Sequence, residues 1–242
     1  MTSPPVRSRR APIAVALDTP DLDEASRWAR LVEPHVTAVK VGLELFTRYG
    51  PDAVASVRGG SGLEVFLDLK LHDIPNTVAG AAKAVARVRP AYLTVHATGG
   101  RAMIRAAADA APDVAITAVT VLTSLDDSAV ADMGFGTTVL DAVRRLAVLA
   151  VEAGARAVVC SPREVAAVRA EVGPEVILIT PGVRPSGSEL GDQARVDTPE
   201  RALANGANLL VVGRPVIRAA DPGAAAASLA AQLRRAGAFP EP

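Results

Sequence analysis

The sequence predicts an α/β fold, a single-domain (β/α)8 barrel of the TIM-barrel type. Two observations carry this prediction. Eight short runs rich in Val, Ile and Leu alternate along the chain with longer, Ala-rich amphipathic segments. The length of 242 residues is typical of one such barrel and does not require a second domain. Because each strand candidate is followed by a helical pattern, we expect a parallel sheet with crossover helices, closed by eight such units.

The elements follow one another in a regular order. Helical patterns such as LDEASRWARLV, NTVAGAAKAVARV and TTVLDAVRRLAVLAVEAG separate the strand candidates. We assign residues 12–238 to the barrel. Residues 1–11 contain Pro and Arg but no apolar region of a secretory signal, and are expected to be a disordered tail. The eight expected strands are IAVALD (13–18), VTAVKV (36–41), LEVFLDL (63–69), AYLTVH (91–96), AITAVTV (115–121), ARAVVC (155–160), EVILIT (175–180) and NLLVVG (208–213).

Composition narrows the class of protein. Lys+Arg and Asp+Glu both number 26, so nothing in the charge balance suggests a nucleic-acid partner. The single cysteine, Cys160, cannot form an internal disulfide, which fits a reducing compartment, and its apolar context predicts a buried thiol. No apolar stretch reaches the ~18–20 residues that a membrane span needs. We therefore expect a cytoplasmic protein without a membrane or nucleic-acid partner.

Alternation along the strands brings charged side chains to one place. Residues two apart share a face of a strand, and the small ones come early while the charged ones come last. Active sites of these barrels lie at the carboxyl ends of the strands, so the charges should converge there. The three inward sets are Ala14, Ala16 and Asp18; Val36, Ala38 and Lys40; and Glu64, Phe66, Asp68 and Lys70.

The segment FLDLKLHDIPNT (66–77) is the strongest candidate for chemistry. Asp68 and Lys70 share a strand face, Asp73 follows the turn, and Pro75 suits the first turn of a helix. Burying an unpaired charge is unfavourable, so an inward Asp and Lys must be paired or functional. The alternative is an ion-pair network that only braces the rim of the barrel.

Lysine usage indicates a proton-transfer group. Of the 26 basic residues only three are lysines, and two of these, Lys40 and Lys70, stand at adjacent strand ends. Arginine does not give up its proton, whereas lysine can be tuned as an acid or base. We therefore expect Lys70 or Lys40 to transfer a proton, and Lys83, on a helical pattern, to be an ordinary surface residue.

A second candidate site lies near the C-terminus. Residues 180–199 form a long Gly/Pro-rich loop after the seventh strand, with residues 182–196 as the expected lid. Barrels commonly bind phosphate with the loops after strands seven and eight and a helix N-terminus. Arg184, Gln193 and Arg214 supply donors, and Gly213 lets backbone N–H groups approach. The alternative for each arginine alone is a solvated surface charge.

Five further polar residues do not reveal their role from sequence alone. Asp18 is equally suited to accept hydrogen bonds from a sugar diol or to cap a helix. Thr123 can present its hydroxyl to a ring. His96 is better explained as an oriented polar core residue than as an acid or base. His35 and His72 have no metal-ligand spacing with other His or Cys, so no metal site is indicated.

At FLDLKLHDIPNT the sequence resembles the orotidine 5′-phosphate decarboxylase family, and the likeness covers nearly the whole chain. The resemblance implies removal of the carboxylate of orotidine 5′-phosphate to give uridine 5′-phosphate and CO2, the last step of de novo UMP biosynthesis. It also implies that the enzyme uses no metal and no organic cofactor. The matching segments occur in the family's order: IAVALDTPD, VKVGLELF, TVHATGG, AVTVLTS, TPGVRPSGSELGDQ and VVGRPV.

The resemblance implies roles for the charged residues. Lys70 would protonate C6 of the pyrimidine as CO2 leaves, and Asp68 would lie beside the substrate carboxylate. Lys40 and Asp73 would complete an alternating charged array with them. Lys40 and Asp18 would also contact the ribose.

The same resemblance implies the remaining substrate contacts. Thr123 would contact the pyrimidine, and Gln193 would bridge phosphate and base. Arg214 and the Gly213 backbone would hold the phosphate, while Arg184 would help to close the site.

The family resemblance also implies a homodimer in which Asp73, Ile74 and Thr77 reach into the neighbouring subunit's site. The nearest rival is a magnesium-dependent sugar-phosphate decarboxylase or aldolase on the same barrel, which shares the Asp-x-Lys-x-x-Asp motif. Such enzymes usually carry a Glu where this chain has Lys40, so Lys40 and the Gly-Asp-Gln loop argue against this rival. A barrel that binds a sugar phosphate without catalysis would leave the inward lysines and carboxylates without a use.

Overall fold

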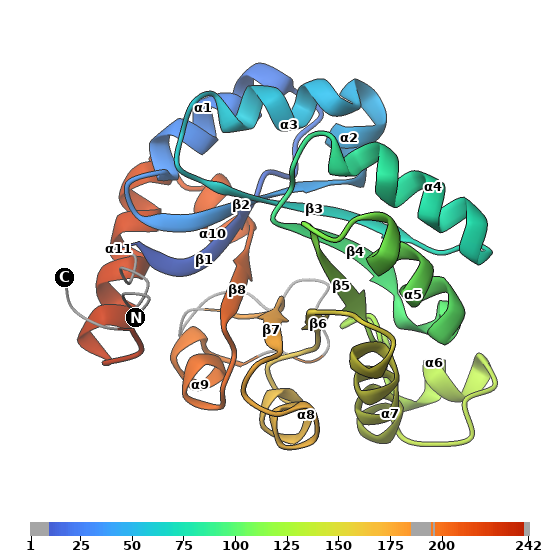
Figure 1. Cartoon of the computed structure of the whole chain (residues 1–242). Coiled ribbons are helices and arrows are strands. Elements are labelled where there is room, and N and C mark those ends of the chain that lie inside the picture. The colour runs from blue at the N-terminus through green and yellow to red at the C-terminus, as the bar shows by residue number, and fades with distance from the viewer. Residues whose placement is uncertain (1–9, 185–194, 196, 240–242) are drawn as a thin grey trace, which may run out of the picture.

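The fold is a closed barrel of eight parallel strands in chain order, as the sequence predicts (Figure 1). It was obtained as a computed structural model that describes residues 10–184, 195 and 197–239. The predicted tail therefore lies almost wholly outside the described residues, and so does most of the expected lid. The strands are β1 (Ala11–Ala16), β2 (Val36–Gly42), β3 (Glu64–Leu71), β4 (Tyr92–His96), β5 (Ala115–Val119), β6 (Ala157–Val159), β7 (Ile177–Thr180) and β8 (Leu209–Val212).

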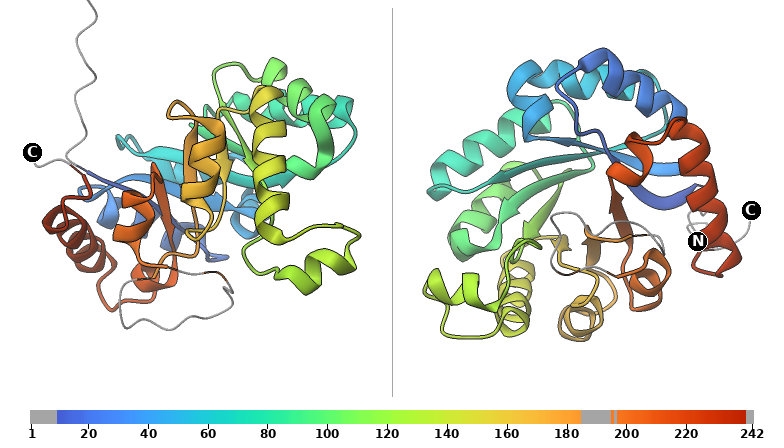
Figure 2. Two further views of the ribbon diagram at one scale, coloured as in Figure 1. Left: turned by 90° about the horizontal axis from the view of Figure 1, so that it is seen from below. Right: turned by 180° about the vertical axis from the view of Figure 1, so that it is seen from behind.

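Helices cover the outside of the barrel (Figure 1). Figures 1 and 2 show α6 projecting from the barrel beside α7. None of the helices in the described part of the chain is long and apolar enough to cross a bilayer. The helices are α1 (Leu22–Val32), α2 (Leu43–Tyr49), α3 (Pro51–Arg58), α4 (Pro75–Ala86), α5 (Gly100–Ala110), α6 (Asp127–Asp132), α7 (Val139–Glu152), α8 (Val165–Val172), α9 (Pro199–Ala204), α10 (Arg214–Ile217) and α11 (Pro222–Arg235), with a 3-10 turn η1 (Ala97–Gly99).

Three strands differ by two residues from their predicted bounds near the candidate site, and one of them, β5, ends at Val119 rather than at residue 121. β1 begins and ends two residues earlier than expected, because the chain turns after Leu17, where the Thr19 N–H donates to the Leu17 carbonyl. β3 runs two residues further than expected, to Leu71. Its pairing with β4 is irregular: Leu67 is opposite Leu93, but Leu71 is opposite Val95. The strand therefore carries extra residues just where the charged side chains lie.

Helix starts follow the capping chemistry of their sequences. The Asp21 side chain caps α1 by accepting a 2.9 Å hydrogen bond from the Glu24 N–H, so the alternative of Asp18 as a helix cap is wrong. Pro75 is the first residue of α4, as predicted. Because Asp21 caps α1, the Asp18 side chain is available for other contacts.

Two apolar clusters hold the barrel together. The larger one fills the layer between strands and helices and includes the buried Cys160, as expected. The smaller one fills the barrel, where Phe66 packs edge-on against Tyr92 with ring centroids 5.9 Å apart. Alanines surround Phe66 on the inner faces of β1 and β2, and these small side chains leave room above them. The open end of this inner layer is where the charged residues lie.

Candidate active site

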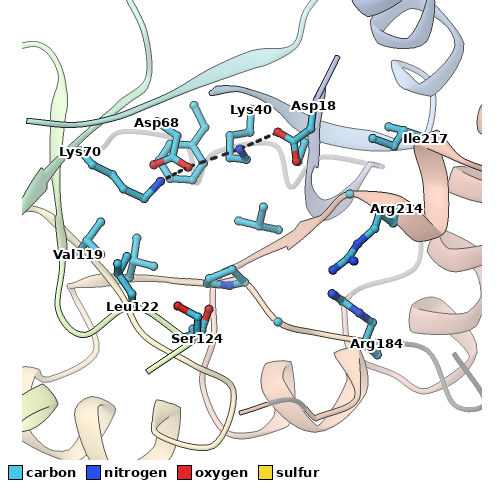
Figure 3. A pocket seen from close by; sticks show the side chains of 18 of the residues that line it. Asp18, Lys40, Asp68, Lys70, Val119, Leu122, Ser124, Arg184, Arg214 and Ile217 are labelled. Atoms are coloured by element: carbon cyan, nitrogen blue, oxygen red, sulfur yellow. Dashed lines mark hydrogen bonds and ion pairs between the residues drawn. The ribbon is translucent and has the colours of Figure 1, made fainter. Parts of the chain in front are cut away.

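Charged residues from three neighbouring strands meet in one cavity of about 510 Å³. Asp18 follows β1, Lys40 lies on β2, and Asp68 and Lys70 lie on β3. All four line the cavity at the carboxyl ends of the strands, as the alternation predicts. Figure 3 shows them as a row along one wall.

The row alternates in sign and is closely paired. Lys40 Nζ lies 3.2 Å from Asp18 Oδ1 and 3.5 Å from Asp68 Oδ2. Lys70 Nζ donates a 2.9 Å hydrogen bond to the same Asp68 oxygen. The side chains of Lys40 and Asp68 are each only 12% exposed, so these pairs are weakly screened by water. In the order Asp18, Lys40, Asp68, Lys70, the Asp68 carboxylate has one ammonium group on each side, that of Lys40 and that of Lys70.

The pairing keeps the two buried members of the row ionised. Burial by itself raises the pKa of Asp68, but Lys40, Lys70 and a hydrogen bond from Thr94 outweigh it and hold that pKa below its ordinary value. Burial likewise lowers the pKa of Lys40, but the carboxylates of Asp68 and Asp18 outweigh it and raise that pKa above its ordinary value. Both charges are therefore present at neutral pH.

Lys70 reaches the cavity by an unusual backbone conformation. Its φ is +51°, one of two positive values among the described residues other than glycine. The prediction that the strand alternation continues regularly through Lys70 is therefore wrong in detail. The irregular pairing of β3 with β4 lies at this residue. Such bulges re-aim side chains near active sites. Lys70 and Asp68 still share the cavity, while Leu69 packs outward against the helices as predicted.

Arginines occupy the opposite wall. In Figure 3 the side chains of Arg184, which follows β7, and Arg214, which follows β8, both point into the cavity. Gly213 also lines the cavity and precedes the short helix α10. A positively charged wall beside a helix start is suited to an anion such as phosphate. Thr123 lines the third side, on the loop after β5.

The structure also places the remaining predicted site residues. Asp73, Ile74 and Thr77 are all exposed and lie outside the set that lines this cavity, with Ile74 66% exposed. Gln193 lies outside the described residues. His96 is half-buried and contacts His72, with ring centroids 5.4 Å apart. Among the described residues, no group of three or more His, Cys, Asp or Glu is arranged to hold a metal ion.

The model of the orotidine 5′-phosphate decarboxylase / HUMPS family matches residues 11–229 of the chain. The chain belongs to this family. The resemblance seen in the sequence motifs is thereby confirmed. Within the family, a protein of Thermobifida fusca (strain YX) named orotidine 5′-phosphate decarboxylase is 67% identical over 230 residues, covering 95% of this chain and 99% of the relative. One of Frankia casuarinae with the same name is 57% identical, covering 94% and 89%.

Solved structures of similar fold agree. The crystal structure of orotidine 5′-phosphate decarboxylase from Lactobacillus acidophilus superposes with a TM-score of 0.78 at 35% identity, covering 90% of this chain and 96% of that one. That of an uncharacterized conserved protein from Geobacillus kaustophilus has a TM-score of 0.77 at 36% identity, covering 90% and 98%. The (β/α)8 fold is thus shared over nearly the whole length of these chains.

Two groups that support the site were given no role from the sequence, although Thr94 is the first residue of the matching segment TVHATGG. Thr94, buried on β4, contacts both Asp68 and the backbone of Lys70. Arg195 pairs with the buried Glu164 and donates to the carbonyls of Val121 and Leu122, on the loop that carries Thr123. A strand threonine and an arginine in a polar loop are ordinary residues in sequence, so no local signal marked them.

Proposed function

We propose that this chain decarboxylates orotidine 5′-phosphate to uridine 5′-phosphate and CO2, the last step of de novo UMP biosynthesis, without metal or organic cofactor. The observation that carries the proposal is the alternating row of Asp18, Lys40, Asp68 and Lys70 facing two arginines across one cavity. Membership of the family and the names of the relatives support it. The enzyme is a carboxy-lyase.

Lys70 is the acid of the proposed reaction. When the bond between C6 and the carboxylate breaks, the electron pair stays on C6 and CO2 leaves. The pyrimidine ring delocalises this charge poorly, so the protein must stabilise it with a preorganised positive group. The Lys70 ammonium serves this purpose, transfers a proton to C6, and regains one from water. Its 2.9 Å hydrogen bond to Asp68 holds it in the cavity before substrate binds.

The other members of the row position the substrate. Asp68 lies beside the carboxylate that is lost, and Lys40 between Asp18 and Asp68 binds the ribose and balances the negative charge. Asp18, on the open side of the row, accepts hydrogen bonds from the ribose diol. Thr123, on the side wall, contacts the pyrimidine.

The arginine wall binds the phosphate in this proposal. Arg184, Arg214 and the Gly213 backbone supply the donors that the cavity presents, and Gln193 is proposed to bridge phosphate and base. The phosphate is remote from the bond that breaks, yet its binding energy can be used to order the site around the reacting atoms.

We further propose a homodimer in which Asp73, Ile74 and Thr77 complete the neighbouring subunit's site. All three lie between the end of β3 and the first turn of α4 and face outward. Ile74 is 66% exposed, so its side chain is accessible to a partner subunit. Asp73 would then extend the charged row from the partner's side. The cytoplasmic location stays a prediction that rests on the single cysteine.

The magnesium-dependent rival predicts a different electrostatic arrangement. Here the ammonium of Lys40 lies within 3.5 Å of both Asp18 and Asp68 and supplies the positive charge that a metal ion would bring there. The deciding assay follows the ultraviolet absorbance of orotidine 5′-phosphate with purified protein in EDTA. We expect full turnover with chelator and none with Lys70→Ala, which should still bind uridine 5′-phosphate. Activity that requires added magnesium, or that survives in Lys70→Ala, contradicts the proposal.

A further inference from the structure

We infer that the buried hydroxyl of Thr94 is a positioning group for the decarboxylation, holding the Lys70 backbone and the Asp68 carboxylate at once. The inference rests on the proposed function in so far as Lys70 and Asp68 act in that reaction. Thr94 is not itself among the residues that line the cavity. Its effect on catalysis is therefore exerted through its two neighbours.

The two hydrogen bonds of Thr94 have fixed directions. The Lys70 backbone N–H donates to Thr94 Oγ1 over 2.7 Å, and this hydroxyl donates to Asp68 Oδ1 over 3.1 Å. A threonine hydroxyl has a single proton, and an ionised carboxylate can only accept. The hydroxyl proton must therefore point at Asp68 while the lone pairs receive the Lys70 amide. Thr94 is fully buried, so no water competes for either bond.

The hydroxyl replaces a missing bond of the sheet. Between the pairs Leu67–Leu93 and Leu71–Val95, three residues of β3 stand opposite Thr94 alone. A bulge leaves ladder groups unpaired, and a buried amide without a partner is unfavourable. The Thr94 side chain accepts this amide, and Lys70 stays in the left-handed region at φ +51°. Non-glycine residues keep that conformation only where their surroundings impose it.

The same hydroxyl also orients the carboxylate. Asp68 uses Oδ2 for both lysines, and Oδ1 accepts from Thr94. With Oδ1 fixed on β4, the plane of the carboxylate is set and Oδ2 is aimed at the two ammonium groups. Removing the hydroxyl would free both the carboxylate and the lysine that bonds to it. A displacement of about 1 Å in a catalytic group can lower a rate by roughly a hundredfold.

The chain offers a matched control on the next strand. Thr117 on β5 is the register partner of Thr94 and is equally buried. Within the described part of the chain, its hydroxyl donates to the Ala115 carbonyl, 2.9 Å away, and not to Asp68 or Lys70. Thr94→Val and Thr117→Val remove the same atom from the same barrel layer, so they share any general effect on packing. They differ in the link to Asp68 and Lys70.

The test compares kcat, KM and the pH profile of the full-length variants with those of the wild type. We expect Thr94→Val to lower kcat by about a hundredfold with KM changed by less than about threefold. Thr94→Ser should recover most of the loss, and Thr117→Val should match the wild type. The acidic limb of kcat/KM should move to higher pH in Thr94→Val, because Asp68 loses a donor. If Thr94→Val does not fold, Thr94→Cys, which keeps the volume but donates weakly, takes its place.

Two outcomes overturn the inference: wild-type kcat and acidic limb in Thr94→Val, or an equal loss in Thr94→Ser and Thr94→Val. A crystal structure of the Thr94→Val variant distinguishes a failure of this inference from a failure of the proposed function. We expect Lys70 to leave the positive-φ region and its Nζ to move away from Asp68. If the wild type does not decarboxylate orotidine 5′-phosphate, the proposed function fails. The backbone conformation of Lys70 in the crystal structure of the valine variant then tests by itself whether Thr94 positions Lys70. An unchanged Lys70 in that crystal structure refutes the role of Thr94.

Discussion

Lys70 donates a 2.9 Å hydrogen bond to the Oδ2 atom of Asp68. The same oxygen lies 3.5 Å from the Nζ atom of Lys40, so one carboxylate holds two ammonium groups. Asp18 supplies a second negative charge to Lys40 only. Asp68 is therefore the electrostatic centre of the row. Both the stability of the row and its proposed chemistry depend on this residue.

Asp68→Asn should destabilise the protein as well as abolish turnover. The change removes a negative charge between two ammonium groups and leaves Lys40, which is only 12% exposed, with Asp18 alone. Breaking a largely buried ion pair from one side typically costs about 3 kcal/mol of unfolding free energy. Urea unfolding of both proteins at one protein concentration measures the loss.

The double variant Asp68→Asn/Lys40→Met provides the control for this prediction. If the loss comes from an unpaired ammonium, removing that ammonium should restore part of the stability. We expect the double variant to be less destabilised than the sum of the single variants by at least about 1 kcal/mol. Strict additivity of the two single effects would show that Asp68 and Lys40 do not stabilise each other.

The pH dependence of stability should carry a contribution from His96. Burial lowers the pKa of His96, and the neighbouring His72 and Lys70 lower it further against a smaller raising effect of Asp68. The unfolded chain then binds the proton more readily than the native state. Stability from this group is full above the ordinary pKa of about 6.5 and is lost as the pH falls from there toward the lowered native value.

Thermal or urea unfolding between about pH 8 and pH 5.5 tests this contribution. The wild type should lose more stability over this range than His96→Gln, in which the titrating ring is absent. The difference between the two proteins should therefore shrink as the pH falls. Parallel curves for both proteins would mean that His96 titrates alike in the folded and unfolded chain.

Gly42→Ala should impair catalysis more than folding. A Cβ atom at Gly42 would lie 3.1 Å from Lys40 Nζ and 3.6 Å from Asp18 Oδ1. The backbone there, at φ −94° and ψ −175°, accepts alanine without strain. We expect unfolding free energy to change by less than about 1 kcal/mol. Since the end of Lys40 must yield, kcat/KM should fall by about tenfold or more.

Gly136→Ala is the matched control for this substitution. A Cβ atom at Gly136 meets no atom within 4 Å of the described part of the chain, and its φ is not positive. Its kcat/KM should equal that of the wild type. If Gly42→Ala also retains wild-type kcat/KM, the exact place of the Lys40 ammonium is unimportant for the reaction.

The sequence was sufficient for the parts of the site that depend on local periodicity. Asp68 and Lys40 follow the two-residue alternation of their strands, and the scarcity of lysine marks Lys40 and Lys70 among many arginines. All eight strands occur near their expected places because short apolar runs flanked by polar residues have few other solutions in this fold.

The parts that were missed depend on contacts between distant segments. The left-handed Lys70 arises from a register shift between β3 and β4, which no pattern within either strand reveals. Thr94 is an ordinary strand former until the bulge opposite it is known. Glu164 and Arg195 come from different loops and meet only after the barrel closes. Short helices such as α2 and α10 are too brief for periodicity to register.

Two inactive variants should restore activity to each other if the site is shared between subunits. Lys70→Ala and Asp73→Ala each lose one group of the proposed site, yet Lys70 lines its own chain's cavity and Asp73 does not. In a mixed dimer one site is then intact and the other lacks both groups. Random pairing after refolding a one-to-one mixture should recover about one quarter of wild-type turnover. Refolding Lys70→Ala with Asp68→Asn is the control and should recover none, because both residues come from the same chain's strand β3. Equal recovery in both mixtures, or none in the first, would contradict a site completed by the partner.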